Sequence, residues 1–335
     1  MEPKSSGPRQ PSLFGESRPA DRPTRVGPAP VDDDLGALGR ALPPNIRLGT
    51  SSWSFPGWAG IVYDRATTPA VLARHGLAAY ARHPVLRAVG VDRTFYAPLS
   101  AQALGEYAAV VPEHFRFLVK APGACTSPWI ETESGERRPN PSFLDPAWAA
   151  AEAVSPYVDG LGPKAGALVF QFVPLGESHT REPARFAARL GAFLAALPRV
   201  PAYAVELRDR ELLCPEYEQA LAAAGAVHCV NVHPRMPPVG EQRRLVASAA
   251  ADRPLVVRWM LHAGLRYEQA RSRYEPFFRL VDEDPESRSA VAELCVEQAC
   301  RGRDVLVIAN NKAEGSAPLT LCKLARAIHD RLARP

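Results

Sequence analysis

The 335-residue sequence lacks a paired cysteine motif, a long apolar run and a glycine-rich turn after its first predicted strand. Its six cysteines form no CxxC pair and have no histidines at zinc-finger spacing, which argues against a metal site. No run approaches the ~18 apolar residues of a membrane span, and the N-terminus lacks the features of a signal peptide. We therefore expect a cytoplasmic protein, not bound to a membrane, whose thiols are reduced and buried.

The overall charge excludes few functions. A formal net charge of +4 and a hydrophobic content of 46% are ordinary for a globular protein. A slightly basic protein suits a small anionic ligand or a nucleic acid, so charge alone does not separate the two.

The first 44 residues differ in composition from the rest of the chain. They are rich in Pro, Arg, Ser and Gly, poor in aromatic residues and without periodicity. Such a segment buries too little apolar surface to offset the entropy lost on ordering. The sequence thus predicts a disordered tail over residues 1–44, either a solvated extension or an electrostatic arm, and one folded domain over residues 45–335.

Short apolar runs alternate with Ala-, Leu- and Arg-rich stretches of helical period throughout that domain. Eight such runs predict strands at residues 46–50, 86–92, 115–120, 166–172, 202–207, 226–232, 255–260 and 304–310. Almost continuously apolar strands that alternate with helices indicate parallel pairing. An open doubly wound sheet would need a glycine-rich turn after the first strand, where "GTSSWSF" stands. We therefore predict an α/β fold, a TIM-type (β/α)8 barrel.

The stretch "GTSSWSFPGW" places two tryptophans directly after the first predicted strand. Trp53 follows the strand at once and is a candidate for stacking on a ligand, although buried aromatics commonly serve packing. Trp58 lies farther into the loop, and we expect it to be a packing anchor.

Polar residues recur where the predicted strands end. In a (β/α)8 barrel these ends meet at one mouth, where chemistry is located. Each residue alone has a structural explanation, such as an ion pair or a helix cap, but a ring of buried charges is costly unless it serves a ligand. The predicted set comprises Trp53, Thr94, Tyr96, Lys120, Gln171, Glu206, Arg208, Arg258, Asn310 and Asn311. A long Pro- and Ser-rich segment, residues 122–146, is a candidate lid or a mobile insertion without a role.

Seven motifs occur in a characteristic order: "GTSSWSFPGW…VY", "VDRTFY", "FRFLVKAP…T", "LVFQFVP", "VELR", "VVRWMLHAG" and "ANNKAEGSAPLTL". In these motifs the sequence resembles the domain of unknown function 72 family, the YecE-like proteins, over residues 46–328. The resemblance implies a TIM-type barrel in a cytoplasmic protein of bacterial type, and a mouth lined by the residues above. It implies no established activity.

The sequence departs from the family pattern at several places. Gly90 and Asp92 stand where the strand-two motif typically has Glu and Asn, and Ser52 stands where a glycine usually precedes the first tryptophan. Asp209 replaces a histidine after the strand-five arginine, and His262 lies farther from Arg258 than usual. If the family's chemistry depends on the strand-two Glu, this member is altered or inactive.

Three functions remain open on the sequence. The first is an enzyme that acts on a small phosphorylated or carboxylated molecule without a metal or cofactor: Arg208 and Arg258 would clamp the anion, and Lys120 and Glu206 would supply acid–base or nucleophilic chemistry. The second is a protein that binds or processes nucleic acid. The third is a non-catalytic scaffold that has lost part of the family's site. Nothing in the sequence indicates an oligomeric state.

Overall fold

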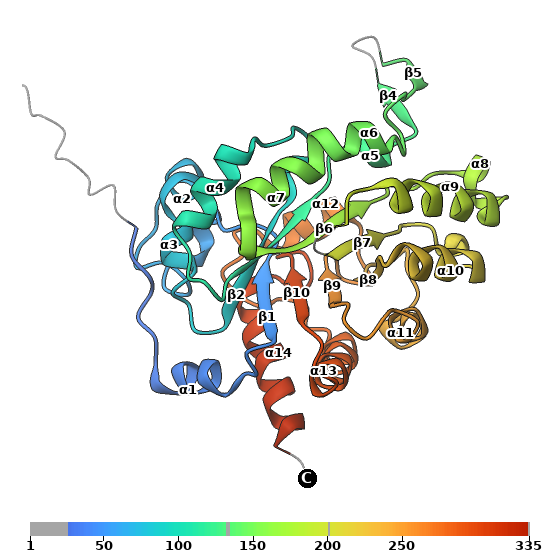
Figure 1. Cartoon of the computed structure of the whole chain (residues 1–335). Coiled ribbons are helices and arrows are strands. Elements are labelled where there is room, and N and C mark those ends of the chain that lie inside the picture. Colours follow the sequence, from blue (N-terminus) through green and yellow to red (C-terminus); the bar gives the residue numbers. More distant parts are fainter. Residues whose placement is uncertain (1–25, 132–134, 200–201, 334–335) are drawn as a thin grey trace, which may run out of the picture.

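The computed structural model describes residues 26–131, 135–199 and 202–333. Eight parallel strands close into a barrel in the order β1-β10-β9-β8-β7-β6-β3-β2, with helices around it (Figure 1). The strands are β1 (Ile46–Thr50), β2 (Leu86–Val91), β3 (Arg116–Lys120), β6 (Ala165–Gln171), β7 (Ala202–Glu206), β8 (Val227–Val232), β9 (Leu255–Trp259) and β10 (Val305–Ala309). All eight predicted strands are confirmed, and with them the predicted barrel.

Several of the surrounding helices begin at residues whose side chains cap them. The Ser100 hydroxyl accepts a hydrogen bond from Ala103 N, and the Asp284 carboxylate accepts one from Ser287 N. The α-helices are α1 (Asp33–Ala41), α2 (Pro69–His75), α3 (Leu77–Tyr80), α4 (Ala101–Ala109), α5 (Gly123–Thr126), α6 (Pro146–Ala149), α7 (Ser155–Leu161), α8 (Glu177–Thr180), α9 (Pro183–Ala196), α10 (Pro215–Ala224), α11 (Val239–Ala247), α12 (Tyr267–Tyr274), α13 (Pro285–Cys300) and α14 (Ala317–Leu332). No helix within the described ranges is long and apolar enough to cross a membrane.

The apolar residues of the strands divide between two cores, because successive side chains of a strand point to opposite faces. One set packs outward against the helices, as Val119 and Val257 do. The other set fills the barrel, and we call it the inner core: Ala88, Leu118, Ala167, Val169, Ala202, Ala204, Val227, Cys229, Val256, Leu306 and Ile308. Inward-pointing positions above and below the inner core are left for polar side chains.

The first and last strands of the barrel are joined directly. Strand β1 pairs in parallel with β10 along its whole length, from Ile46 opposite Val305 to Thr50 opposite Ala309. The Asn45 amide adds two hydrogen bonds to this seam, donating to the carbonyl oxygens of Ala299 and Arg303 at 3.1 and 2.8 Å.

Part of the predicted disordered tail is folded. Residues 33–41 form helix α1, which packs near α14 and buries Leu38. Asp32 caps the helix, and the Arg87 guanidinium donates hydrogen bonds to carbonyl oxygens at its end, including those of Leu42 and Pro43. The tail prediction therefore does not hold for residues 26–44, because a few leucines and a cap suffice when the barrel supplies the packing surface. Residues 1–25 lie outside the described residues.

The predicted lid segment contains a small antiparallel hairpin of β4 (Trp129–Glu131) and β5 (Arg137–Pro139). The hairpin stands away from the barrel on the side toward which the barrel strands run (Figure 1). Its base is fixed by the Asn140 amide, which donates to the carbonyl oxygens of Ala124 and Ser127 at 2.8 and 2.7 Å. The side chains of both strands are exposed. Whether the hairpin acts as a lid stays a prediction.

Candidate functional site

A layer of polar side chains covers the inner core at the carboxyl ends of the strands. Along a strand, every second side chain points to the same face. Each member of this layer comes two residues after a side chain that points into the barrel, so it also points toward the barrel axis. Lys120 follows Leu118, Glu206 follows Ala204, and Arg258 follows Val256. The layer consists of Ser51, Asp92, Lys120, Gln171, Glu206, Asn231, Arg258 and Asn310.

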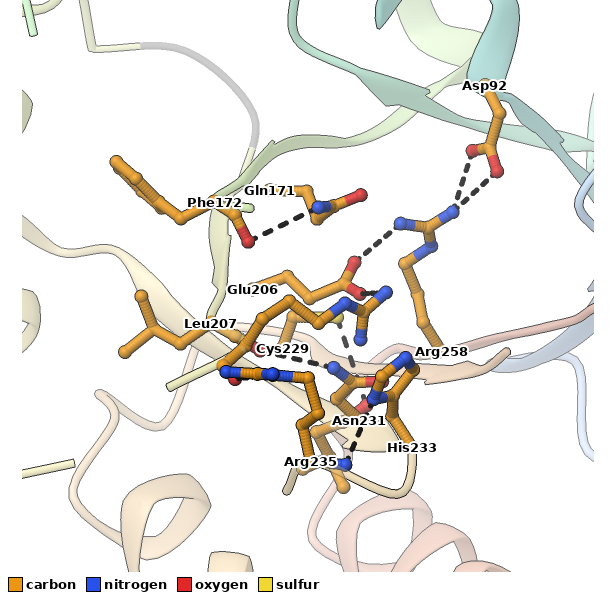
Figure 2. A network of polar contacts seen from close by, with 12 residues as sticks. Asp92, Gln171, Phe172, Glu206, Leu207, Cys229, Asn231, His233, Arg235 and Arg258 are labelled. Atoms are coloured by element: carbon orange, nitrogen blue, oxygen red, sulfur yellow. Dashed lines mark hydrogen bonds and ion pairs between the residues drawn. The ribbon is translucent and has the colours of Figure 1, made fainter. Parts of the chain in front are cut away.

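Arg258 is the centre of this layer (Figure 2). Its guanidinium is 1% exposed and lies between two carboxylates. Nη1 donates to Glu206 Oε2 at 2.5 Å, and Nη2 lies 2.8 and 2.7 Å from the two Asp92 oxygens. Burial alone would lower the pKa of Arg258, but Asp92 and then Glu206 outweigh it and raise the pKa. Arg258 therefore stays charged, and both sides of it are occupied by protein carboxylates.

Glu206 is fully buried and holds two arginines. Its Oε1 lies 2.6 Å from Arg208 Nη2, while Oε2 accepts the hydrogen bond from Arg258. Burial would raise the pKa of Glu206, but Arg208 and then Arg258 more than offset this effect and lower it to about 2. The carboxylate is thus ionised at neutral pH.

Arg208 has a side of its guanidinium that the protein does not use. Nη1 is buried, and no described residue provides it with a hydrogen-bond partner. Asn231 of β8 is fully buried, and its amide donates to the carbonyl oxygen of Leu207, the residue before Arg208, while its Oδ1 is without a partner among the described residues. Buried polar groups are nearly always hydrogen-bonded, so these two atoms mark a place where a ligand would complete the network.

Lys120 lies against an aromatic ring. Its Nζ is 3.6 Å from the centre of the Phe95 ring, and the residue is 9% exposed. Burial is the main cause that lowers the pKa of Lys120 to about 8; Arg258 and Arg208 act in the same direction as burial, and Asp92 and Glu206 oppose it. An amine with this pKa exchanges protons readily near neutral pH.

Thr94 fixes the position of Lys120 and does not face the mouth with its hydroxyl. Its Oγ1 lies 2.7 Å from Val91 O and 2.6 Å from Lys120 O, so it ties the ends of β2 and β3 together. Thr94 therefore lies next to Lys120, where its hydroxyl holds the backbone of the two strand ends in place.

The two predicted asparagines after β10 face different partners. The Asn310 amide donates to Ser51 Oγ at 2.8 Å within the polar layer. Asn311 is 1% exposed, and its Oδ1 accepts from Trp58 Nε1 at 3.2 Å and from Ala317 N at 2.8 Å. Asn311 therefore joins the first loop to the last helix, and Trp58 is the predicted packing anchor.

Three other predicted residues have partners or surroundings that the sequence does not specify. The Trp53 indole is 5% exposed and donates to Leu72 O at 3.1 Å, so its ring packs in the wall of the barrel. Tyr96 is 87% exposed, because the chain after β2 turns into a short helix, Asp92–Phe95, that carries it to the surface. The Gln171 amide donates to Phe172 O at 3.2 Å. A ligand role for these three stays a prediction.

The structure adds residues to the predicted set. Asp92 and Asn231 belong to the polar layer, and Lys312 lies within the electrostatic reach of Asp92, with its Nζ 4.4 Å from the centre of the Tyr267 ring. Burial lowers the pKa of Lys312, with Asp92 as the strongest opposing charge. The alternation of β2 and β8 points Asp92 and Asn231 inward, and this signal is present in the sequence.

The position where the resemblance expects a strand-two Glu is occupied by Gly90, which points toward the barrel interior. A Cβ atom there would lie 3.0 Å from Ser51 Cα and 3.2 Å from Ile308 Cγ2. The second departure, Asp92, supplies the carboxylate that pairs with Arg258. No group of three or more His, Cys, Asp or Glu side chains among the described residues is arranged to hold a metal ion.

Comparison with known proteins gives a family and a fold. The model of a family described as "Protein of unknown function DUF72" matches residues 47–335. A DUF72 family protein (TM1631) from Thermotoga maritima is 21% identical, with a TM-score of 0.57, over 86% of this chain and 99% of that chain. A DUF72 family protein (EF0366) from Enterococcus faecalis is 18% identical, with a TM-score of 0.56, over 84% and 95% of the two chains. No curated protein matched the chain.

Proposed function

The chain belongs to the DUF72 family. We propose that it is an enzyme that binds a small carboxylated or phosphorylated molecule with Arg208 and moves a proton with Lys120. The observation that carries this proposal is the buried Arg208 Nη1, which has no hydrogen-bond partner among the described residues. A guanidinium with one side paired and one side free presents a donor to an incoming oxyanion.

The charges of the site support an anionic ligand. Four cations, Lys120, Arg208, Arg258 and Lys312, meet two anions, Asp92 and Glu206. Four positive minus two negative charges leaves an excess of two. Because Asp92 and Glu206 pair with Arg258, and Glu206 also pairs with Arg208, this excess resides mainly on the two lysines. A mono- or dianion would compensate it.

The proton-transfer role falls to Lys120 and not to Glu206. The sequence predicted both as catalytic residues. A carboxylate with a pKa of about 2 is a weak base at neutral pH, whereas an amine with a pKa of about 8 is close to the working range of general acid–base catalysis. In our proposal Glu206 orients Arg208 and keeps Arg258 in place, and it does not contact the reacting atoms.

The proposal is tested by the binding of defined anions. We would measure melting temperature and binding heat with a panel of 2-oxo acids, hydroxy acids and sugar phosphates, since a ligand of the folded state raises its stability. We expect at least one small anion to bind wild type, and Arg208→Met to weaken it tenfold or more. The matched control is Arg210→Met, which removes an exposed arginine two residues along the chain.

Two lysine variants separate binding from chemistry. Lys120→Arg keeps a cation but has a far higher pKa, so it should bind the anion and fail to turn it over. Lys120→Met should weaken binding as well. Equal affinity of wild type and Arg208→Met for every anion would overturn the proposal. Stabilisation by oligonucleotides alone, with steep salt dependence, would point to the nucleic-acid alternative, and no ligand effect at all would favour the scaffold.

A further inference from the structure

A recess lies at the end of the barrel opposite to the polar layer, where the strands begin. It has a volume of about 460 Å³. Small residues at the starts of strands, among them Ala165 of β6 and Ala202 of β7, leave it open, and Leu306 of the inner core is part of its lining. This volume lies within the range of sites that accept small molecules.

Four arginines from different segments line this recess: Arg47 of β1, Arg116 of β3, Arg253 before β9 and Arg303 before β10. Arg116 precedes the inner-core residue Leu118 by two positions, so the strand turns it inward as it turns Lys120 inward at the other end. The two inward-pointing polar layers therefore lie on opposite sides of the apolar inner core.

The positive charge of the recess is only partly compensated. Two carboxylates, Asp252 and Asp304, line it together with the four arginines, so four minus two leaves an excess of two charges. Arg47 Nη1 pairs with Asp304 at 2.8 Å, whereas Arg253 Nε lies 3.8 Å from Asp252. The ion pairs thus account for at most two of the arginines.

The remaining two arginines are held by backbone carbonyls. Arg303 donates to Val246 O and Ala249 O at 3.2 and 2.7 Å, and Arg116 Nη1 donates to Glu113 O and Phe115 O at 2.8 and 2.9 Å. Carbonyl oxygens fix the direction of a guanidinium without neutralising its charge. The arginines are therefore oriented and remain electrostatically available to a ligand.

Neighbouring titratable groups sense the same accumulation of positive charge. Burial lowers the pKa of His114, and Arg87, Arg47 and Arg116 lower it further. Burial also lowers the pKa of Arg116, with Arg47 adding to the effect and Asp304 opposing it. Like charges held close together without full compensation favour an anion among them.

We propose that this recess is a second anion site, which binds a small molecule carrying one or more phosphate groups. Planar guanidinium groups match phosphate oxygens in pairs, and several of them around one concave surface suit a multiply charged anion. In a (β/α)8 barrel this end mainly supplies stability, and chemistry lies at the other mouth. The ligand would therefore be held without being transformed, independently of the proposed function of the mouth.

Inorganic pyrophosphate is the probe for this site. We would titrate the full chain by calorimetry at constant ionic strength, with sodium chloride as the reference salt. We expect pyrophosphate to bind wild type and to lose tenfold or more in affinity in Arg116→Gln/Arg253→Gln. Arg185→Gln, which removes an exposed charge from α9, is the matched control and should bind as wild type does.

The mouth variant Arg208→Met distinguishes the two sites. The recess of this variant should still bind pyrophosphate with the affinity found in wild type, because the inner core separates Arg208 from the recess. Loss of binding in Arg208→Met, or unchanged binding in Arg116→Gln/Arg253→Gln, would overturn the proposal. A single-stranded oligonucleotide that displaces pyrophosphate at lower concentration would also overturn it in favour of a nucleic-acid surface.

Chemical protection gives an answer even if the double variant does not fold. Phenylglyoxal modifies exposed guanidinium groups, and mass spectrometry locates the modified residues in wild-type protein. We expect pyrophosphate to slow the modification of Arg253 and Arg116 at least fivefold while leaving Arg185 unaffected. Equal modification rates with and without pyrophosphate would contradict the site.

Discussion

The Lys120 ammonium nitrogen lies 3.6 Å from the centre of the Phe95 ring, at the carboxyl end of β3. The ring shields the amine from water on one side, while Asp92, Glu206, Arg208 and Arg258 determine the field around it. A cation over a ring face is stabilised, yet burial of the amine outweighs this contact and lowers its pKa.

The pKa of Lys120 should follow the neighbouring charges in a stated order. We expect ¹³C NMR of the lysine side chains to give a pKa of about 8 in wild type. Asp92→Asn should lower this pKa further, because Asp92 is the strongest group that favours the charged form, and Arg208→Met should raise it. Glu283→Gln, an exposed substitution on the surface, is the control and should leave the titration unchanged. An unperturbed titration near 10.4 in wild type would refute the electrostatic description.

Glu206→Gln should be strongly destabilising. The substitution removes one of the two carboxylates that pair with the buried Arg258, and it removes the carboxylate that pairs with Arg208. Breaking a buried ion pair typically costs about 3–5 kcal/mol. Glu177→Gln breaks the exposed pair with Arg181 and should cost at most about 1 kcal/mol. Urea unfolding of both variants measures the difference. Similar losses in the two variants would show that burial of Glu206 contributes nothing special.

Acid should remove the same stabilisation gradually. The folded-state pKa of Glu206 is about 2, below its ordinary value of 4.5, so the unfolded chain binds the proton first as the pH falls. The contribution of Glu206 is therefore complete above about pH 4.5 and is lost as the pH falls toward 2. The difference in unfolding free energy between wild type and Glu206→Gln should shrink across this window. A constant difference would contradict the lowered pKa.

Two glycine-to-alanine substitutions should have opposite signs. At Gly90, the new Cβ would approach Ser51 Cα and Ile308 Cγ2 more closely than packed atoms usually do, and overpacking typically costs about 1–3 kcal/mol. At Gly105, inside α4, the nearest atom to a new Cβ is Gly160 O at 3.6 Å, and alanine should stabilise the helix by about 0.5–1 kcal/mol. Thermal unfolding of both variants is the measurement. A stabilised Gly90→Ala would show that the strand accommodates a side chain here.

Helix α1 should contribute measurably to stability. Removing residues 1–41 deletes the packed Leu38 and the Gly39 carbonyl that binds Arg87, contacts that a disordered tail over residues 1–44 would not make. We expect a melting temperature several degrees below that of a chain that begins at residue 26. Leu38→Ala should cost about 2 kcal/mol, and the exposed Arg40→Ala much less. Equal melting temperatures for the two chain lengths would restore the original prediction.

The sequence predicts the barrel because the apolar strand pattern repeats eight times and each repeat ends in polar residues. The alternation of strands also places Lys120, Glu206 and Arg258 at one end, since it depends only on position within a strand. Pairing cannot be read in this way. Arg258 is bound by Asp92 and Glu206, from strands that do not adjoin each other, and only the closed barrel brings them together.

The surroundings of other residues could not be predicted, because local context overrides residue type. Trp53 follows a strand, as a ligand-stacking residue would, yet its indole N–H finds a backbone acceptor in α2 and its ring is buried. Tyr96 follows the short helix Asp92–Phe95, so it leaves the barrel axis within four residues. The sequence does not predict the arginine cluster at the amino ends of the strands, because that end of a (β/α)8 barrel mainly supplies stability.

The hydrogen bonds of Asn311 join Trp58, in the loop after the first strand, to Ala317 at the start of the last helix. These hydrogen bonds and the pairing of β1 with β10 close the barrel. Closure therefore depends on contacts between the beginning and the end of the domain's sequence. During synthesis, β1 is made early but cannot find its second neighbour until β10 has left the ribosome. Until then the nascent sheet has two open edges, which are prone to pairing with other chains. The half-made barrel is therefore open to association with other chains for as long as β10 is missing.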